Sequence, residues 1–233
     1  MALLELRDVT QRFGGVVALD DVSFSVEEGE IAGLIGPNGA GKTTAFNVIA
    51  RLYKPEAGDV LFDGKSILRT PPYKVVRRGI GRTFQNVELF STMTVLDNVL
   101  VGAHGRRSAR AREMLDYVGI TDLAERPVSG LPYATLKRIE LARALVSQPR
   151  LLLLDEPAGG LSHEEVESLA DFITRTRKEF GLTVILVEHH MNLVMRVSDS
   201  VTVLDFGKRI AGGAPAEVQR DPAVIEAYLG TTD

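Results

Sequence analysis

The segment Ile31–Thr43 reads I-A-G-L-I-G-P-N-G-A-G-K-T, and it is the part of the chain that says most about the fold. Its second half, Gly36–Thr43, fits the pattern G-x-x-x-x-G-K-[ST]. The pattern alone can occur by chance, in an ordinary glycine-rich turn with a surface lysine, so its context decides. An apolar run, Ile31–Ile35, precedes the pattern, and the helix-compatible segment Thr44–Arg51 follows it. In such a strand–loop–helix setting, glycines let backbone N–H groups turn toward phosphate oxygens at a helix N-terminus, whose dipole favours an anion. The stretch predicts a nucleoside triphosphate site.

The loop and the first helical residues are the candidates for holding the triphosphate. Lys42 adds a point charge at the β- and γ-phosphates, and the Thr43 hydroxyl is a ligand for Mg²⁺. The candidate nucleotide-binding residues are Gly36, Pro37, Asn38, Gly39, Ala40, Gly41, Lys42, Thr43 and Thr44.

A second candidate site lies at the acidic end of the apolar run Leu151–Leu154, where Asp155 and Glu156 follow directly. Side chains alternate between the faces of a strand, so these two carboxylates serve different tasks. Asp155 fits the Mg²⁺ shell, directly or through a water, and Glu156 fits the general base that orients or deprotonates the attacking water. A strand that simply ends in solvent would explain the acidic end but not the phosphate loop upstream.

The order of apolar and polar segments predicts an α/β fold. Leu151–Leu154 and Val184–Val187 are continuous apolar runs, typical of parallel strands covered on both faces, and a capping box of Ser162 and Glu165 opens a helix between them. The segment from Val95 to Ser147 has no strand-like run and predicts a helical insertion. Further strands are expected at Leu3–Val9, Val22–Val26, Val60–Phe62 and Ser200–Leu204, a long helix at Tyr133–Val146, and two short helices within Ala216–Leu229.

Composition excludes several classes of protein. The 233 residues include no cysteine and carry a net charge of −4, which excludes disulfide frameworks and thiolate sites and argues against a nucleic-acid binder. The basic cluster of Arg106, Arg107, Arg110 and Arg112 lacks interleaved aromatic residues and is interpreted as a solvated helix face. The beginning of the chain lacks the features of a signal peptide, and no apolar run is long enough to span a bilayer. These features predict a cytosolic soluble domain.

Together these residues resemble the ATP-binding cassette ATPases, the motor subunits of ABC transporters, from Leu3 to about Leu229. By this resemblance Phe13 corresponds to the aromatic that stacks on adenine, although a core phenylalanine is the alternative interpretation. Gln85 corresponds to the glutamine that links the Mg²⁺ and water site to the permease-facing surface, and it is a further candidate metal ligand. His189 corresponds to the histidine that contacts the γ-phosphate and the catalytic glutamate, here Glu156. The candidate catalytic residues are therefore Glu156, His189 and Gln85.

The family's L-S-G-G-Q signature is altered in this chain. The matching positions read Leu131, Pro132, Tyr133, Ala134 and Thr135. Pro132 removes a hydroxyl and a backbone donor, and Ala134 replaces a glycine where the backbone approaches phosphate. Proline is tolerated in the first turn, so we expect the helix to survive. In this family a signature serves the nucleotide of the other subunit, so the weakened half-site would be the partner's.

Four stretches resemble the importer ATPases for branched-chain amino acids and for related solutes such as amides or urea. They are Arg82–Asn86, Leu89–Phe90 with Met93–Leu96, Asp155–Leu161 and Val224–Gly230, whereas Val101–Leu115 is shorter than that branch predicts. The resemblance implies a RecA-like P-loop core with an N-terminal antiparallel β part. It also implies one ATP-binding domain over residues 3–230, with a helical subdomain inserted at roughly 86–147.

The implied activity is ATP hydrolysis with ATP and Mg²⁺, on the inner face of the cell membrane. The implied partners are a second ATPase subunit, integral-membrane permease subunits and, indirectly, a solute-binding protein. A paralogue is favoured over a second copy as the ATPase partner, because transport should retain at least one fully furnished site. The alternatives are an exporter or lipid-extraction motor, or a switch that dimerises on ATP and hydrolyses it weakly.

Overall fold

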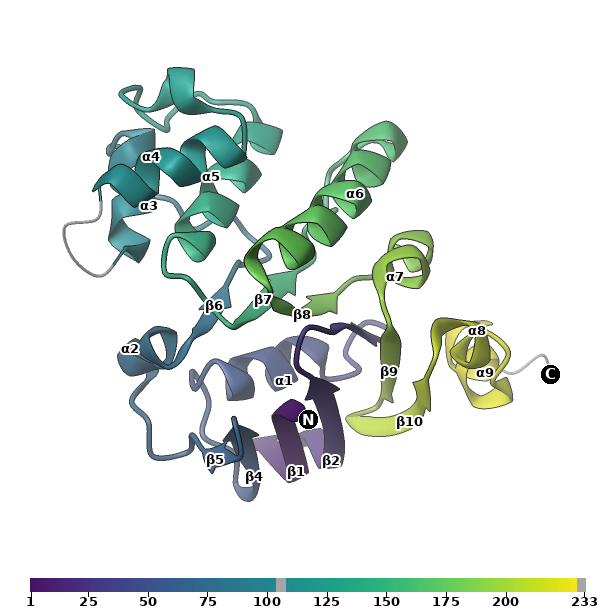
Figure 1. Ribbon diagram of the computed structural model, residues 1–233. Helices are drawn as coiled ribbons and strands as arrows, with labels where there is room; N and C mark the ends of the chain where they lie inside the picture. Colours follow the sequence, from purple (N-terminus) through teal and green to yellow (C-terminus); the bar gives the residue numbers. More distant parts are fainter. Residues whose placement is uncertain (104–107, 230–233) are drawn as a thin grey trace.

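A six-stranded sheet carries the phosphate loop at its centre (Figure 1). The structure is a computed structural model that describes residues 1–103 and 108–229. Five of the strands are parallel and β10 pairs antiparallel at one edge. In spatial order the strands are β10 (Lys208–Gly213), β9 (Ser200–Asp205), β3 (Ile31–Ile35), β8 (Thr183–Val187), β7 (Leu151–Asp155) and β6 (Ile80–Arg82). Every residue of β3, β7 and β8 is buried, as their continuous apolar runs predict.

A second, antiparallel sheet is formed by the N-terminal part of the chain. Its spatial order is β2 (Val16–Glu27), β1 (Ala2–Phe13), β4 (Ala57–Phe62) and β5 (Lys65–Ser66). Helix α1 (Lys42–Ile49) lies between the two sheets, and its fully buried Phe46 belongs to the same apolar core as Leu4 of β1 and Ile185 of β8 (Figure 1). This packing holds the helix that follows the phosphate loop from both sides.

The other helices lie along the parallel sheet and in a lobe beside it. Between β6 and β7 the chain forms α3 (Val95–Gly102), α4 (Ser108–Tyr117) and α5 (Tyr133–Leu145), which make a lobe beside the sheet (Figure 1). The other helices are α2 (Pro72–Val75), α6 (His163–Phe180), α7 (Met191–Val197), α8 (Pro215–Val218) and α9 (Pro222–Leu229), with short 3₁₀ turns at Val76–Arg78 and Thr121–Leu123. Over the stretches that the structure describes, no helix is both long and apolar enough to cross a membrane.

The predicted α/β fold is confirmed, with a P-loop core, an antiparallel β part and helices between the strands. The predicted capping box is also present: the Ser162 hydroxyl accepts from the Glu165 N–H at 3.4 Å, and the Ser162 N–H donates to Glu165 Oε2 at 2.8 Å. Arg112 is 53% exposed and pairs with Glu125, as on a solvated helix face. Arg110 also pairs with Glu113, but it is only 21% exposed and lies over the Phe180 ring, so the interpretation does not hold for it. Arg106, Arg107 and Gly230 lie outside the described residues.

Some element boundaries differ from the prediction. Helix α1 begins at Lys42 rather than Thr44, because Gly41, at φ 102°, ends the loop one residue before it. Strand β6 was not predicted, since Ile80–Arg82 is too short to show a periodicity. Strands β1 and β2 are longer than Leu3–Val9 and Val22–Val26. Strand β1 continues through the polar residues Thr10–Arg12, and β2 begins at a second apolar run, Val16–Leu19, which Asp20 and Asp21 separate from Val22–Val26.

Candidate functional site

The candidate site residues meet at one edge of the parallel sheet. The phosphate loop follows β3, Glu156 follows β7, His189 follows β8, and Gln85 follows β6. These four strands run in the same direction, so their carboxyl ends and the segments after them come together. The edge has the position at which open α/β sheets bind ligands.

Two glycines give the phosphate loop its shape. A Cβ on Gly36 would lie 2.0 Å from the Leu204 carbonyl oxygen, and one on Gly41 would lie 2.5 Å from the Ala18 carbonyl oxygen. Both residues also have φ values, 151° and 102°, that L side chains avoid. The loop therefore rests directly on the backbone behind it. At its end α1 begins without a side-chain cap, which leaves its first N–H groups for an anion.

Lys42 is buried and folds back over the loop. Its Nζ donates to the Gly36 carbonyl at 2.7 Å and to the Pro37 carbonyl at 2.8 Å. Burial lowers the pKa of the Lys42 ammonium, and the nearby carboxylates of Glu156 and Asp155 oppose that shift. The ammonium is therefore attracted toward the two acidic residues and already lies above the loop in which phosphates would bind.

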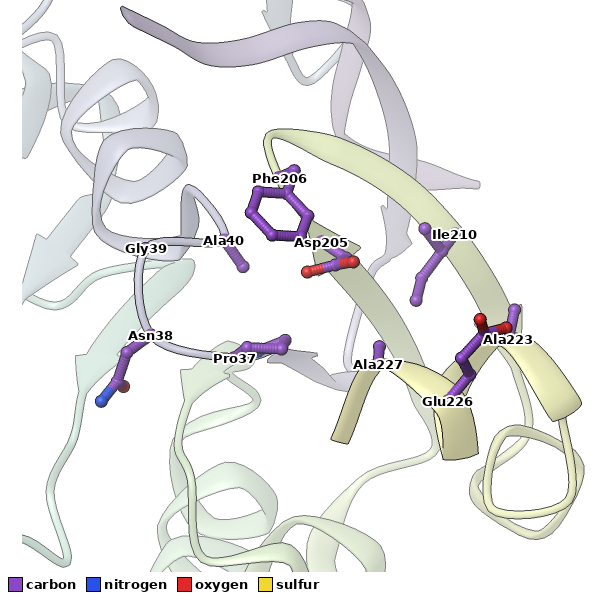
Figure 2. A pocket seen from close by; sticks show the side chains of 10 residues that line it. All are labelled: Pro37, Asn38, Gly39, Ala40, Asp205, Phe206, Ile210, Ala223, Glu226 and Ala227. Carbon is purple, nitrogen blue, oxygen red and sulfur yellow. The ribbon is translucent and has the colours of Figure 1, made fainter. Parts of the chain in front are cut away.

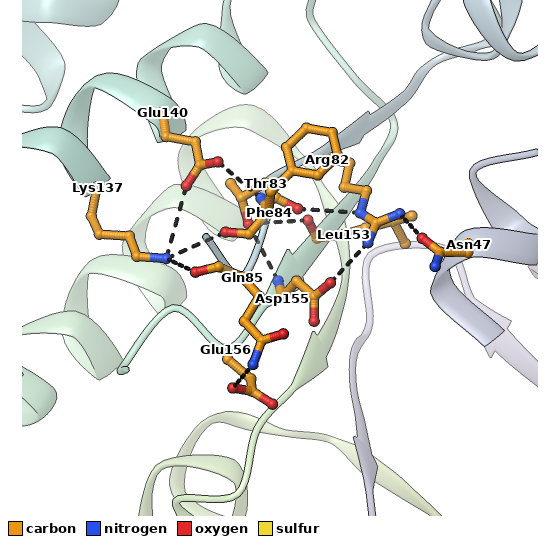
Figure 3. Close-up of polar contacts among 10 residues, drawn as sticks. All are labelled: Asn47, Arg82, Thr83, Phe84, Gln85, Lys137, Glu140, Leu153, Asp155 and Glu156. Atoms are coloured by element: carbon orange, nitrogen blue, oxygen red, sulfur yellow. Dashed lines mark hydrogen bonds and ion pairs between the residues drawn. The ribbon is translucent and has the colours of Figure 1, made fainter. Parts of the chain in front are cut away.

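Asp155 is 1% exposed and forms an ion pair that the sequence did not predict. Its Oδ2 accepts from Arg82 Nη2 at 2.8 Å, and Arg82 Nη1 also donates to Asn47 Oδ1 of α1 at 2.6 Å (Figure 3). Burial raises the pKa of Asp155, and the Arg82 guanidinium opposes this shift. The second carboxylate oxygen, Oδ1, is buried and has no hydrogen-bond partner among the described residues. A free anionic oxygen near the phosphate loop fits a hard cation such as Mg²⁺.

Gln85 and His189 both lie beside Glu156. Gln85 Nε2 donates to Glu156 Oε2 at 2.8 Å (Figure 3). His189 Nδ1 lies 3.9 Å from the same oxygen. Glu156 has φ 46°, a left-handed conformation that turns its side chain away from that of Asp155. The carboxylate is 21% exposed, in contrast to its buried neighbour. The structure thus brings together the three residues that the sequence singled out for catalysis.

Phe13 lies at the end of β1 with 44% of its surface exposed. Its ring makes an edge-to-face contact with Tyr53, with ring centroids 5.0 Å apart. A core phenylalanine would be buried, so this interpretation of Phe13 is wrong. An exposed, laterally supported ring is suited to stacking against a flat base.

Sequence reasoning missed two buried charged residues of the site, Arg82 and Glu188. Glu188 is 0% exposed and accepts from the N–H groups of Ala158 at 2.7 Å, His189 at 3.1 Å and His190 at 3.3 Å. It therefore fixes the turn that carries His189. Glu188 directly follows the apolar run Val184–Val187, just as Asp155 follows Leu151–Leu154. The same pattern therefore indicates both residues.

A cavity of about 460 Å³ lies on another flank of the phosphate loop (Figure 2). It is bounded by Pro37–Ala40 on one side and by the β9–β10 turn and α9 on the other. Among the residues that the structure describes, its ionisable lining side chains are Asp205 and Glu226, and both are acidic, which disfavours a phosphate there. The candidate face of the loop for a phosphate is the one on which Lys42 lies.

The altered signature forms the start of α5. Pro132 is the N-cap residue with φ −57° and makes no side-chain cap, and the helix continues to Leu145. The expectation that the helix survives the proline is thus confirmed. Tyr133 is 43% exposed, and its ring lies 3.4 Å from the position of a Cβ built on Gly160.

Comparison with known proteins identifies close relatives. Residues 19–159 match the family model described as ABC transporter, and residues 208–233 match that of the branched-chain amino acid ATP-binding cassette transporter. The chain is 41% identical to the high-affinity branched-chain amino acid transport ATP-binding protein BraF of Pseudomonas aeruginosa, over 98% of both chains. It is 39% identical to LivG of Escherichia coli strain K12, a protein of the same description, again over 98% of both chains.

Solved structures agree with these matches. A nucleotide-free ATP-binding cassette from an ABC transporter superposes with a TM-score of 0.91 at 30% identity, over 99% of this chain and 100% of that one. The ADP conformation of an ATP-binding cassette superposes with a TM-score of 0.90 at 30% identity and the same coverage.

Proposed function

The chain belongs to the ABC transporter family and is an ATP-binding cassette ATPase, and we propose that its ATP hydrolysis energises the import of branched-chain amino acids, or a related small polar solute, through a membrane permease. The observation that carries the proposal is the convergence of Gln85 and His189 on Glu156 at the sheet edge that holds the phosphate loop. A strand that merely ended in solvent would not place an amide and an imidazole beside one carboxylate.

In the proposed mechanism the phosphate loop receives the triphosphate and Phe13 stacks on the adenine. Gly36–Thr44 offers backbone N–H groups, and Lys42 exchanges its two carbonyl partners for the β- and γ-phosphates. When bound, Mg²⁺ would supply neutralisation of charge that develops on the phosphates, and Thr43, Gln85 and Asp155 are the residues that would hold it. The partnerless Oδ1 of Asp155 supports this assignment.

Glu156 acts on the attacking water as general base or orienter. The Gln85 amide fixes its carboxylate by donating to Oε2 at 2.8 Å. His189 is 52% exposed beside that carboxylate, so it can turn toward the γ-phosphate. Its place is held by the buried Glu188, which accepts from the His189 N–H.

The transported solute is proposed from the relatives. Proteins described as branched-chain amino acid transport ATP-binding proteins are about two-fifths identical to this chain over nearly its full length. The match of residues 208–233 to a model of the same transporter class supports this assignment independently of the phosphate loop. The chain would work on the cytoplasmic face of the membrane, with a solute-binding protein acting on the other side.

A paralogous ATPase is proposed as the partner subunit. A homodimer would place Pro132 and Ala134 at both nucleotides, so both sites would lack the same donor, whose loss costs roughly 2.7–4 kcal/mol in a catalytic site. In a heterodimer the site built on Lys42 and Glu156 would receive the partner's signature instead. The residues proposed here act within one ATP-binding domain, residues 3–230, with the helical lobe at roughly 86–147 as its inserted subdomain.

Calorimetry with Mg-ATP tests the proposed function. The full chain should bind Mg-ATP, and Lys42→Met should lower its affinity by at least tenfold. Such a loss corresponds to at least about 1.4 kcal/mol of binding free energy. Arg150→Met, a change of an exposed arginine away from the loop, is the matched control and should bind as the parent does. Unchanged affinity in Lys42→Met would refute the assignment of the loop. Turnover that stays negligible in the assembled transporter would favour the alternative of an ATP-dependent dimerisation switch.

A further inference from the structure

Three metal-ligating side chains follow one another directly after β8. Glu188, His189 and His190 form the turn that joins β8 to α7, and one ligand atom from each lies within 4.8 Å of those of the other two. Neighbouring side chains of a strand point to opposite faces, but the strand ends at Val187. The two imidazole rings can therefore lie side by side, with centroids 4.7 Å apart and planes tilted by 33°. We call these three residues the Glu-His-His turn.

The carboxylate of the Glu-His-His turn is fixed by the backbone around it. Glu188 is fully buried, and its oxygens accept from the N–H groups of Ala158, His189 and His190. An ionised carboxylate has about four acceptor positions, so these three donors leave about one for a metal ion. A rigid oxygen ligand therefore lies beside the two imidazole rings.

The imidazole nitrogens of the turn are free of competing contacts in the part of the chain that the structure describes. His189 and His190 form hydrogen bonds there through their backbone N–H groups and not through their rings, and His190 makes no side-chain cap on α7. The His189 ring is 52% exposed and His190 is half-buried, so an ion can reach both from solvent. His189 Nδ1 also lies 4.0 Å from Glu188 Oε2.

The donor set selects the class of metal ion. Two imidazoles and one carboxylate are the protein ligands of zinc sites that keep a fourth position open. Zinc–nitrogen bonds are about 2.0–2.1 Å long, so two ligand atoms of a tetrahedral site lie roughly 3.3 Å apart. The separation of 4.0 Å between His189 Nδ1 and Glu188 Oε2 has to shorten by less than about 1 Å, which rotation of the exposed His189 ring supplies. Mg²⁺ prefers oxygen ligands, so it competes poorly for two imidazoles.

From this arrangement we propose that the Glu-His-His turn is a binding site for Zn²⁺ and that the bound ion inhibits hydrolysis. The binding does not depend on the proposed function, whereas the inhibition rests on it. His189 cannot turn toward the γ-phosphate while its ring is bound to the ion. The same imidazole nitrogen lies 3.9 Å from Glu156 Oε2, so the positive charge of the ion also attracts the catalytic carboxylate. Zn²⁺ thus withdraws two groups from the reaction.

Calorimetry of the full chain with Zn²⁺, in the absence of nucleotide and Mg²⁺, tests the site. The parent should bind about one Zn²⁺ at the turn, and His190→Asn should weaken this binding at least tenfold, since even the loss of an outer-shell partner costs about that much. His163→Asn changes a histidine outside the turn, so it is the matched control and should bind as the parent does. Co²⁺ in place of Zn²⁺ should give the visible absorption bands of a four-coordinate site in the parent and in His163→Asn, but not in His190→Asn. If His190→Asn does not fold, as judged by thermal unfolding, His190→Gln replaces it.

Turnover of the assembled transporter tests the inhibition. Free Zn²⁺ is fixed with a chelator buffer in excess Mg-ATP, and each rate is divided by the zinc-free rate of the same variant. The parent and His163→Asn should lose activity over the range in which the chain binds Zn²⁺, whereas His190→Asn should need at least about tenfold more free Zn²⁺ for the same loss.

The outcomes separate this proposal from the proposed function. No Zn²⁺ binding by the parent, or equal affinity in the parent and His190→Asn, would overturn the site. Equal sensitivity of their turnover to Zn²⁺ would overturn the inhibition. A parent complex that neither binds nor hydrolyses Mg-ATP would refute the proposed function, while the calorimetric result with Zn²⁺ alone would still decide whether the site exists.

Discussion

Replacing Arg82 by methionine removes one partner of the buried ion pair with Asp155. The two side chains are 10% and 1% exposed, so water cannot replace the lost guanidinium. Removing one partner of a buried pair costs about 3–5 kcal/mol, because the remaining charge is left without compensation. The methionine side chain preserves most of the contact with the rings of Phe46 and Phe84 on which Arg82 lies. We therefore expect Arg82→Met to lower the free energy of unfolding by about that amount at pH 7.5.

The effect of Arg82→Met should depend on pH with a defined sign. Burial already raises the pKa of Asp155, so folding favours the protonated carboxyl. The resulting contribution to the free energy of unfolding is complete below the pKa of an unfolded aspartate. It falls as the pH rises through the folded-state pKa. Without Arg82 the folded-state pKa of Asp155 rises further. The gap between the folded and unfolded pKa values therefore widens, and the loss of unfolding free energy at neutral pH becomes larger. Below about pH 4 the carboxyl is protonated in both states, and most of the difference between the variant and the parent should disappear.

Urea unfolding at pH 7.5 and near pH 4 measures both expectations. Arg82→Met/Asp155→Asn should recover much of the loss, because no buried charge remains. Arg150→Met is the matched control: it removes the exposed ion pairs with Glu28 and Asp63 and should cost no more than about 1 kcal/mol. Equal losses of stability in Arg82→Met and Arg150→Met, or a loss in Arg82→Met that does not change with pH, would contradict an uncompensated buried charge on Asp155.

Three further changes have defined outcomes. Phe13→Ala should weaken ATP binding by about 1–3 kcal/mol, the value of one base–aromatic stack, and leave inorganic triphosphate binding unchanged in competition calorimetry. Ser162→Ala removes the cap of α6 and should lower the free energy of unfolding by about 1 kcal/mol in urea, and a neutral result would contradict the capping box. Gly36→Ala places a Cβ 2.0 Å from the Leu204 carbonyl oxygen, so the melting temperature and the ATP affinity of the variant should both fall. Parent-like values would show that the loop can move to make room for the methyl group.

Local patterns in the sequence predicted the centre of the site. The loop Gly36–Thr43 combines strand, glycines and helix in one continuous stretch, and Asp155 and Glu156 follow an apolar run that has to be a buried strand. Both signals depend on neighbours in the chain, so they can be read without the fold. The same is true of the capping box at Ser162.

The supporting contacts could not be predicted in this way. Arg82 reaches Asp155 across 73 positions, and Glu140 reaches Phe84 across 56. Neither residue lies in a pattern that indicates its partner, since β6 has three residues and α5 carries polar side chains on several faces. Their pairing follows from the placement of β6 beside β7 and of α5 beside the segment after β6, which is a property of the assembled fold.

Turnover of Glu156→Gln is the sharpest test of the catalytic role assigned to Glu156. The amide cannot take a proton from water, so the variant in the assembled transporter should hydrolyse Mg-ATP at least about a hundredfold more slowly than the parent. Its Mg-ATP affinity should be retained, because Lys42 and the loop are intact, and an ATP-bound dimer should accumulate. Hydrolysis by Glu156→Gln at the parent rate would contradict the account, since Glu156 would then not be the catalytic carboxylate.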